Sequence, residues 1–124
     1  MVKIAVLPLI LLNIAIGVSA QLSLKNGMNK VGYIRVTDLL SKNIFKVISE
    51  TFVLLGIFLY IIDTGLWLVI LSQEELSFAY PLLGLGYLIT AVLAKLFLKE
   101  SLTFFKLIGI LLIISGAYLI IIRV

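Results

Sequence analysis

Four long apolar runs, separated by one basic segment and two very short polar ones, constrain this chain more than any other feature. A helix needs roughly 20 apolar residues to cross a bilayer core about 30 Å thick, and each run supplies that length. In lipid every backbone amide must find its partner within the chain, so runs of this length are expected to be helices. With 63% hydrophobic and 13% charged residues, the chain has too little polar surface for a soluble domain of its size.

The sequence therefore predicts an all-α integral membrane bundle of four transmembrane helices, folded as a single domain over residues 1–124. The helices are expected at about residues 3–24, 48–72, 76–97 and 103–122. The first run has a rival interpretation as a cleaved secretory signal, because Lys3 precedes it and Val18-Ser19-Ala20 resembles a cleavage site. Its length and its polar residues, Asn13 and Gln21, favour an uncleaved helix.

The distribution of basic residues predicts the orientation. Segment 25–47 carries five basic residues against Asp38, and segment 98–102 also lies among lysines, whereas segment 73–75 has no basic residue. Basic residues in short loops favour the cytoplasm. We expect segments 25–47 and 98–102 to be cytoplasmic and both termini to lie outside, in a single orientation. The net charge of +4 follows from this topology and does not indicate nucleic-acid binding, because the basic residues are not interleaved with a stacking platform.

Polar residues inside the spans are the candidates for function, because unpaired polar groups in hydrocarbon are costly. In the first helix Asn13, Gly17, Gln21 and Lys25 recur every four residues and therefore lie near one face. This face predicts either contacts that join helices through Asn13 and Gln21, or a substrate path that ends at Lys25. An ammonium group at the membrane interface could hold a phosphate.

The second helix carries Tyr60, Asp63 and Trp67 on a related face. Asp63 falls near the middle of its span, where a charged carboxylate facing lipid is costly, so it should point inward. It is either a functional group, an ion-pair partner of a lysine such as Lys95, or a neutral acid bonded to Thr64.

The third helix carries Tyr80 and Tyr87, and its Pro81 removes a backbone donor and can kink the helix. Gly84 and Gly86 allow another backbone to approach. The aromatic residues serve either for packing or as the lining of a groove, and their alternation with glycine favours the groove.

In the fourth helix Gly109 and Gly116 lie seven residues apart on one face and predict a dimerisation seam, because small residues let membrane helices pack closely.

The chain contains no cysteine and no histidine, and the lack of cysteine excludes disulfides and thiolate metal sites. It offers no nucleophile–base pair, no phosphate loop and no metal cluster. We therefore expect no enzyme activity, no cofactor and no metal.

Several short motifs resemble the drug/metabolite transporter superfamily, and the resemblance covers nearly the whole chain. They are Ala79-Tyr80-Pro81 at the start of the third helix, Leu96-Phe97-Leu98-Lys99-Glu100-Ser101-Leu102, Leu107-Ile108-Gly109 and Ser115-Gly116. Two small four-helix groups of that superfamily compete. One is the small multidrug resistance family, and the other is the pair of subunits that flip aminoarabinose-phosphoundecaprenol across the bacterial inner membrane.

The first helix distinguishes the two groups. Small multidrug transporters place a membrane-embedded Glu at the position that aligns with Gly17, and this first helix has no acid. The sequence Ala20-Gln21-Leu22-Ser23-Leu24-Lys25 is instead similar to the flippase subunits, as are two further motifs, Leu66-Trp67-Leu68 and Phe78-Ala79-Tyr80-Pro81-Leu82-Leu83. The long basic segment and Asp63 depart from the flippase pattern.

The resemblance implies a dimeric transporter of the plasma (bacterial inner) membrane that flips a polyprenyl-phosphate-linked sugar or a related anionic glycolipid. The alternative is proton-coupled efflux of a small cation or metabolite, with Asp63 replacing the missing acid of the first helix; a third possibility is an accessory subunit that does not transport. The partner is either a second copy or a second four-helix subunit. The expected substrate-binding residues are Asn13, Gln21, Lys25, Tyr60, Asp63, Trp67, Tyr80 and Tyr87. Among them, Gln21 and Lys25 are expected to receive the phosphate.

Overall fold

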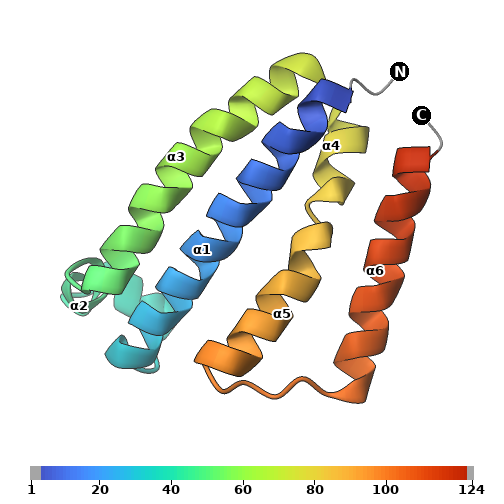
Figure 1. Ribbon diagram of the computed structural model, residues 1–124. Helices are drawn as coiled ribbons and strands as arrows, with labels where there is room; N and C mark the ends of the chain where they lie inside the picture. The colour runs from blue at the N-terminus through green and yellow to red at the C-terminus, as the bar shows by residue number, and fades with distance from the viewer. Residues whose placement is uncertain (1–3, 123–124) are drawn as a thin grey trace.

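The computed structural model describes residues 4–122, which form helices and, over that range, no strand (Figure 1). Four helical segments are long and apolar enough to cross a membrane: Leu7–Val31, Thr51–Gln73, Leu76–Phe97 and Phe104–Ile122. This confirms the predicted all-α bundle of four spans. Lys3, where the first helix was expected to begin, lies outside the described residues. The first described element is a 3-10 turn, η1 (Ile4–Val6).

Helix α1 (Leu7–Val31) is longer than predicted, because it ends at Val31 and not near Leu24. Gly32 follows it with a φ of 93°, a conformation open mainly to glycine, and its N–H donates to the Met28 carbonyl at 2.9 Å. The hydropathy pattern indicates where α1 leaves the hydrocarbon core of the bilayer, and not where the helix ends. The helix itself continues until a residue can adopt the turn that ends it.

The segment expected as a loop is partly helical. Residues 32–50 contain a 3-10 turn, η2 (Val36–Leu40), and a short helix, α2 (Ile44–Ile48), which contacts both α1 and α3. Helix α3 (Thr51–Gln73) begins slightly later than predicted, after Glu50, whose carboxylate accepts the Phe52 N–H at 3.5 Å. We call residues 32–50 the basic linker.

The third span is broken into α4 (Leu76–Leu82) and α5 (Leu85–Phe97). Pro81 lacks an N–H, and the N–H groups of Leu83 and Gly84 bond three residues back, to Tyr80 and Pro81, at 3.1 and 3.0 Å. Gly84 sits at the break, where an added Cβ would lie 2.8 Å from Ile113 Cγ2. The third span can bend here because glycine leaves room for α6 (Phe104–Ile122).

The helices are arranged around α1, which runs along α3 and also contacts α5, while α6 contacts α4 and α5 (Figure 1). Buried apolar side chains join the spans, and the main cluster comprises Val6, Ile10, Ile14, Val18, Ile70, Phe78, Ala79, Leu82 and Ala117. The basic linker and the α5–α6 connection lie at one end of the bundle. The α3–α4 connection and the described end of α6 lie at the other (Figure 1).

Candidate binding groove

A groove of about 320 Å³ lies between α1, α3 and the broken third span. Its polar lining includes Asn13, Gln21, Tyr60, Asp63, Tyr80, Tyr87 and Thr90. The structure therefore brings together six of the eight residues that the sequence singled out, from three different spans. Lys25 and Trp67 are not among the lining residues.

Asp63 is held in the groove by Asn13. The Asn13 side chain is only 3% exposed, and its Nδ2 donates to Asp63 Oδ1 at 2.7 Å and to the Asp63 backbone carbonyl at 3.1 Å. On the other side of the carboxylate, an added Cβ at Gly17 would lie 3.1 Å from Oδ2. The amide thus fixes one carboxylate oxygen, and the missing side chain of Gly17 leaves room beside the other.

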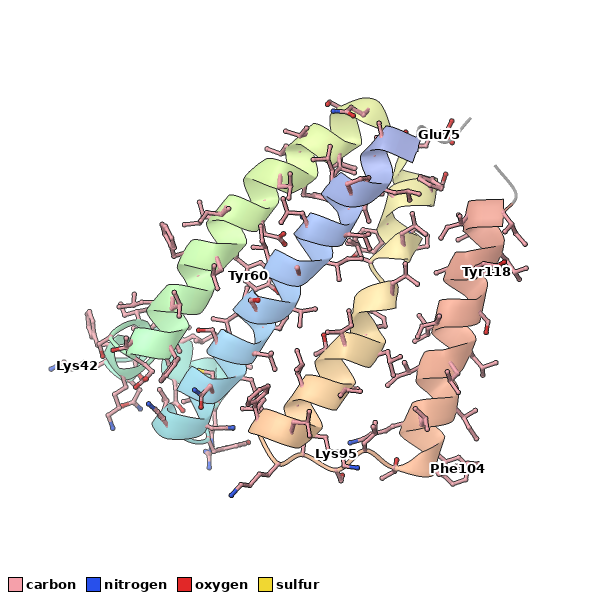
Figure 2. The ribbon with its side chains drawn as sticks, viewed as in Figure 1. Lys42, Tyr60, Glu75, Lys95, Phe104 and Tyr118 are labelled. Carbon is pink, nitrogen blue, oxygen red and sulfur yellow. The ribbon has the colours of Figure 1, made fainter. Side chains whose placement is uncertain are left out.

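The structure does not pair Asp63 with a lysine or with Thr64, the structural partners that the sequence suggested. Among residues 4–122, no lysine or arginine forms an ion pair with Asp63. Lys95 lies at the end of the bundle that carries the α5–α6 connection (Figure 2). The Thr64 hydroxyl donates to the Tyr60 carbonyl at 2.8 Å. Asp63 therefore presents an acceptor to the groove that a cation or a proton could satisfy.

Gln21 and Tyr60 form a second contact between α1 and α3, in which Gln21 Nε2 donates to the Tyr60 hydroxyl. Tyr60 lies partway along the bundle, away from both ends (Figure 2). The antiparallel course of the two helices places this pair nearer than Asp63 to the basic linker. Two polar contacts between α1 and α3 therefore follow one another along the groove: Asn13 with Asp63, and Gln21 with Tyr60.

The aromatic residues divide into those that line the groove and one that supports it. Tyr80 and Tyr87 line it from the third span. Trp67 packs edge-on against Tyr80, with ring centroids 6.1 Å apart and an interplanar angle of 66°. Such a geometry is favourable for aromatic pairs and orients the Tyr80 ring.

Sequence reasoning did not select Thr90, although it lines the groove with Tyr87. Thr90 lies three residues after Tyr87, a spacing that places both on one helix face. Its hydroxyl donates to the Gly86 carbonyl at 2.8 Å. Gly86 in turn lets α5 approach α1, because an added Cβ would lie 2.9 Å from Ile14 Cγ2.

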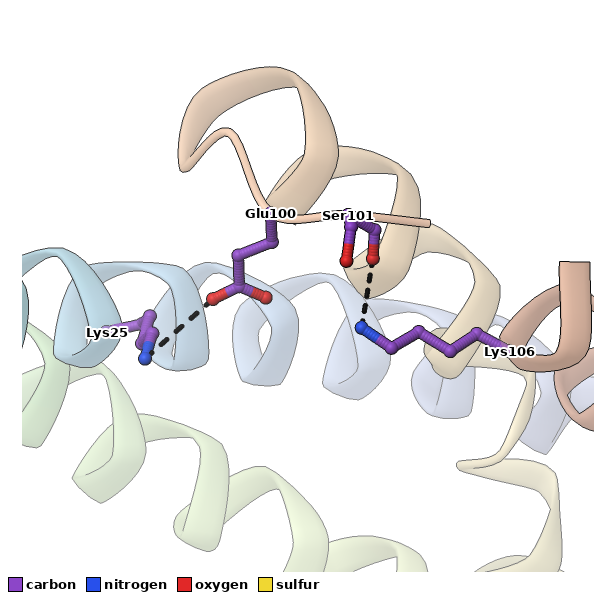
Figure 3. Close-up of polar contacts among 4 residues, drawn as sticks. All are labelled: Lys25, Glu100, Ser101 and Lys106. Carbon is purple, nitrogen blue, oxygen red and sulfur yellow. Dashed lines mark hydrogen bonds and ion pairs between the residues drawn. The ribbon is translucent and has the colours of Figure 1, made fainter. Parts of the chain in front are cut away.

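Lys25 lies one turn beyond Gln21, outside the groove, and its ammonium is 3.8 Å from Glu100 Oε1 (Figure 3). Glu100 belongs to the connection between α5 and α6. Its N–H donates to the Ala94 carbonyl at 3.2 Å, and Lys99 before it adopts a φ of 57°. Lys106 of α6 also contacts this connection, because its Nζ donates to the Ser101 carbonyl at 2.9 Å. Lys25 thus joins the end of α1 to the α5–α6 connection.

Gly109 and Gly116 lie on α6, and an added Cβ at either would meet nothing within 4 Å. Ala117 is the buried residue of this helix. Gly116 nevertheless lines a cavity of about 330 Å³ between α6 and the broken third span, so this face is turned partly toward the same chain. The dimer seam stays a prediction. Over residues 4–122 no group of three or more acidic, histidine or cysteine side chains could hold a metal.

Comparison with known proteins gives a match to the EamA-like transporter family over residues 4–122. The chain is 33% identical over 110 residues to the probable 4-amino-4-deoxy-L-arabinose-phosphoundecaprenol flippase subunit ArnF of Proteus mirabilis, covering 82% of this chain and 80% of that protein. It is 31% identical over 113 residues to the protein of that name from Enterobacter sp., covering 89% of each. A shorter match, 35% over 63 residues, is to the probable subunit ArnE of Pseudomonas fluorescens, covering 49% of this chain and 55% of that protein.

No solved structure gives a significant match to the chain.

Proposed function

We propose that this chain, which belongs to the EamA-like transporter family, is one subunit of a flippase that moves a polyprenyl-phosphate-linked sugar across the bacterial inner membrane. The observation that carries the proposal is a groove within the spans whose one carboxylate, Asp63, is positioned by Asn13 and has no ion-pair partner in the described chain. The likeness to flippase subunits over most of the chain supports the choice of substrate.

The groove suits the sugar part of such a lipid. Tyr60, Tyr80 and Tyr87 offer hydroxyl groups and aromatic faces, and Asp63 accepts hydrogen bonds from an amine or a hydroxyl group on the sugar. The relatives are named for a sugar that carries an amino group. We propose that Asp63 pairs with such an ammonium, while the polyprenyl tail stays in the bilayer.

The phosphate and the sugar amine would reach their sites in sequence. Asn13 and Lys25 are twelve residues apart on one helix, which corresponds to about 18 Å along its axis. A single sugar phosphate is shorter than that distance. Lys25 would therefore receive the phosphate at the end of the bundle, after displacing Glu100, and Asp63 would receive the amine only after the headgroup has moved into the groove.

The test combines two substitutions in cells and in proteoliposomes. A charge-assisted bond contributes about 1.5–3 kcal/mol, so Lys25→Ala should weaken binding of the phospholipid substrate about ten- to a hundredfold. Lys25→Arg keeps the charge and serves as the matched control. Asp63→Asn should abolish flipping of an amino-sugar lipid and spare a lipid whose sugar has no amine. Normal flipping by both Lys25→Ala and Asp63→Asn would reject the proposal.

The alternative, proton-coupled efflux of a small cation, is favoured by one specific observation. The Asp63 carboxylate lies beside Gly17, the position that aligns with the membrane-embedded Glu of small multidrug transporters. Asp63 could thus supply from α3 the acid that α1 lacks. Cation resistance lost in Asp63→Asn cells and unchanged in Lys25→Ala cells, with glycolipid translocation unaffected by both, would select this function.

We further propose that the basic linker and the α5–α6 connection face the cytoplasm, with both termini outside. The two basic segments share one end of the bundle, which supports a common side. Reporter fusions at Val124 test the orientation, and equal signals from both sides would contradict a single orientation.

Four helices give little room to enclose a bulky headgroup. We therefore propose a dimer with a second copy or a second four-helix subunit, which mass measurement in lipid would test.

A further inference from the structure

The basic linker exposes large apolar side chains outside the four spans. Tyr33, Val36 and Leu40 are 91, 83 and 95% exposed, and Phe45 is 63% exposed. Within the spans, apolar exposure is expected because the side chains face lipid. In a linker surrounded by water the same exposure would be unfavourable, so these side chains need an apolar neighbour.

The linker also carries unpaired positive charge. Arg35, Lys42 and Lys46 are exposed, and over residues 4–122 none of them forms an ion pair. The one acid between them, Asp38, is occupied within the linker: its Oδ2 accepts the Arg35 N–H at 2.8 Å and its Oδ1 accepts Asn43 Nδ2 at 3.4 Å. The other acid of the linker, Glu50, lies at its end and accepts the Phe52 N–H. With three basic residues against two acidic ones, the linker presents a net positive surface interspersed with apolar side chains.

The position of the linker matches the level of the lipid headgroups. It connects the end of α1 to the start of α3, and α2 contacts both helices. Figure 1 shows it lying beside these two helix ends and not extending away from them. In Figure 2 Lys42 reaches outward from the bundle. Both the apolar and the basic side chains are thus available to a bilayer surface.

We propose that the basic linker lies in the membrane interface, with Phe45 and Leu40 inserted among the lipids and its basic residues bound to anionic phospholipid headgroups. An apolar surface combined with lysine and arginine is the composition that binds anionic membrane surfaces. This role is independent of the transported substrate, since none of these residues lines the groove. It anchors the ends of α1 and α3 at one membrane surface.

The test places a tryptophan reporter in the linker of the full-length protein. Phe45→Trp is made with Trp67→Phe, because Trp67 is the only tryptophan of the chain. The protein is reconstituted in vesicles of phosphatidylcholine with a fixed fraction of phosphatidylglycerol. Two preparations are compared: in one the phosphatidylcholine carries brominated acyl chains, and in the other the phosphatidylglycerol does. Leu40→Trp provides a second reporter at an exposed position, in case Phe45→Trp fails to fold.

The reporter should emit at shorter wavelength than a tryptophan in water, and brominated lipid should quench it. Each basic residue near the surface contributes about 1 kcal/mol to the free energy of binding an anionic membrane. Phosphatidylglycerol should therefore be enriched beside each basic residue of the linker about fivefold. Phe58→Trp, made with Trp67→Phe and exposed within the α3 span, is the matched control and should be quenched by either lipid without preference. Changing Arg35, Lys42 and Lys46 together to Gln should abolish the preference, as should high salt, which screens exposed charges.

Three results would overturn the proposal. Emission typical of water without quenching would place the linker outside the bilayer. Equal quenching by the two brominated lipids at low salt would show that the linker does not bind anionic headgroups selectively. A blue shift that appears only when a second protein subunit is added would instead make the linker a protein interface.

Discussion

The Asn13 amide and the Asp63 carboxylate meet at 2.7 Å and join α1 to α3 within the membrane-spanning part of the bundle. Asn13 also donates to the backbone carbonyl of the same residue, so one side chain fixes both the carboxylate and the helix that carries it. A carboxylate that has one bound oxygen and an open space beside the other is prepared to accept a second donor. That geometry is the basis of the first two predictions.

We predict that Asn13 and Asp63 are energetically coupled. Hydrogen bonds between membrane helices average about 0.6 kcal/mol and reach about 1.7 kcal/mol in double-mutant cycles. Asn13→Ala, Asp63→Ala and the double variant should therefore give a coupling free energy of about 0.5–2 kcal/mol, measured by reversible unfolding in mixed detergent micelles. Strictly additive effects would contradict a direct bond.

The space beside Asp63 predicts different outcomes for two glycines. In Gly17→Ala the new Cβ would lie 3.1 Å from Asp63 Oδ2, so the carboxylate must move by a few tenths of an ångström. In Gly65→Ala the Cβ would meet nothing within 4 Å. Replacing a glycine inside a helix by alanine gains about 0.5–1 kcal/mol. Gly65→Ala should show that gain in its free energy of unfolding.

Gly17→Ala should gain less stability than Gly65→Ala and should lose substrate affinity, because its methyl group displaces the carboxylate and narrows the groove. Thermal unfolding and transport assays on the two purified variants measure both effects. If the two variants gain equal stability and transport equally well, the space beside Asp63 has no role in binding.

Much of the bundle could be predicted because lipid imposes strict requirements on a chain. Hydropathy located the four spans, and the four-residue spacing of Asn13, Gly17 and Gln21 correctly placed them on one helix face. The same spacing did not show how far the groove extends along the axis. Lys25 and Trp67 continue the two faces by one more turn, yet neither lines the groove. Where the groove ends depends on how closely the spans approach one another, as Gly86 of α5 approaches Ile14 of α1, and the spacing within one helix does not show that.

The ends of helices were the least predictable part of the fold. Residues such as Lys25 and Lys30 are polar enough to end an apolar run, but both are good helix formers, and α1 includes them. Lys30 also gains a neighbour there, because its ammonium lies 4.2 Å from the centre of the Phe52 ring. The ion pair of Lys25 with Glu100 likewise depends on a tertiary approach between segments far apart in sequence.

We predict that Glu100 competes with substrate phosphate for Lys25. The ion pair is exposed, and such pairs contribute about 0–1 kcal/mol, so Glu100→Gln should change the free energy of unfolding only slightly. If phosphate must displace Glu100, the variant should bind the phospholipid substrate up to about fivefold more tightly. Binding at low salt to protein in nanodiscs measures the effect.

The control for this prediction is Lys25→Ala combined with Glu100→Gln. Without the ammonium, the loss of the carboxylate should bring no gain in affinity. A gain of equal size in the double variant would mean that Glu100 acts through general repulsion of the phosphate and not through Lys25.

The last prediction concerns the glycine face of α6. Gly116→Leu should leave the fold of one chain intact, because its Cβ would meet nothing within 4 Å and the cavity of about 330 Å³ that Gly116 lines has room for the rest of the side chain. It should weaken association of two subunits if Gly109 and Gly116 form the seam, since small residues are what allow membrane helices to approach closely. Gly65→Leu, on the equally open face of α3, controls for the added bulk. Native mass spectrometry and cross-linking in lipid should show fewer dimers for Gly116→Leu than for Gly65→Leu. Fewer dimers for Gly65→Leu would instead indicate that the subunits associate through α3 and not through α6.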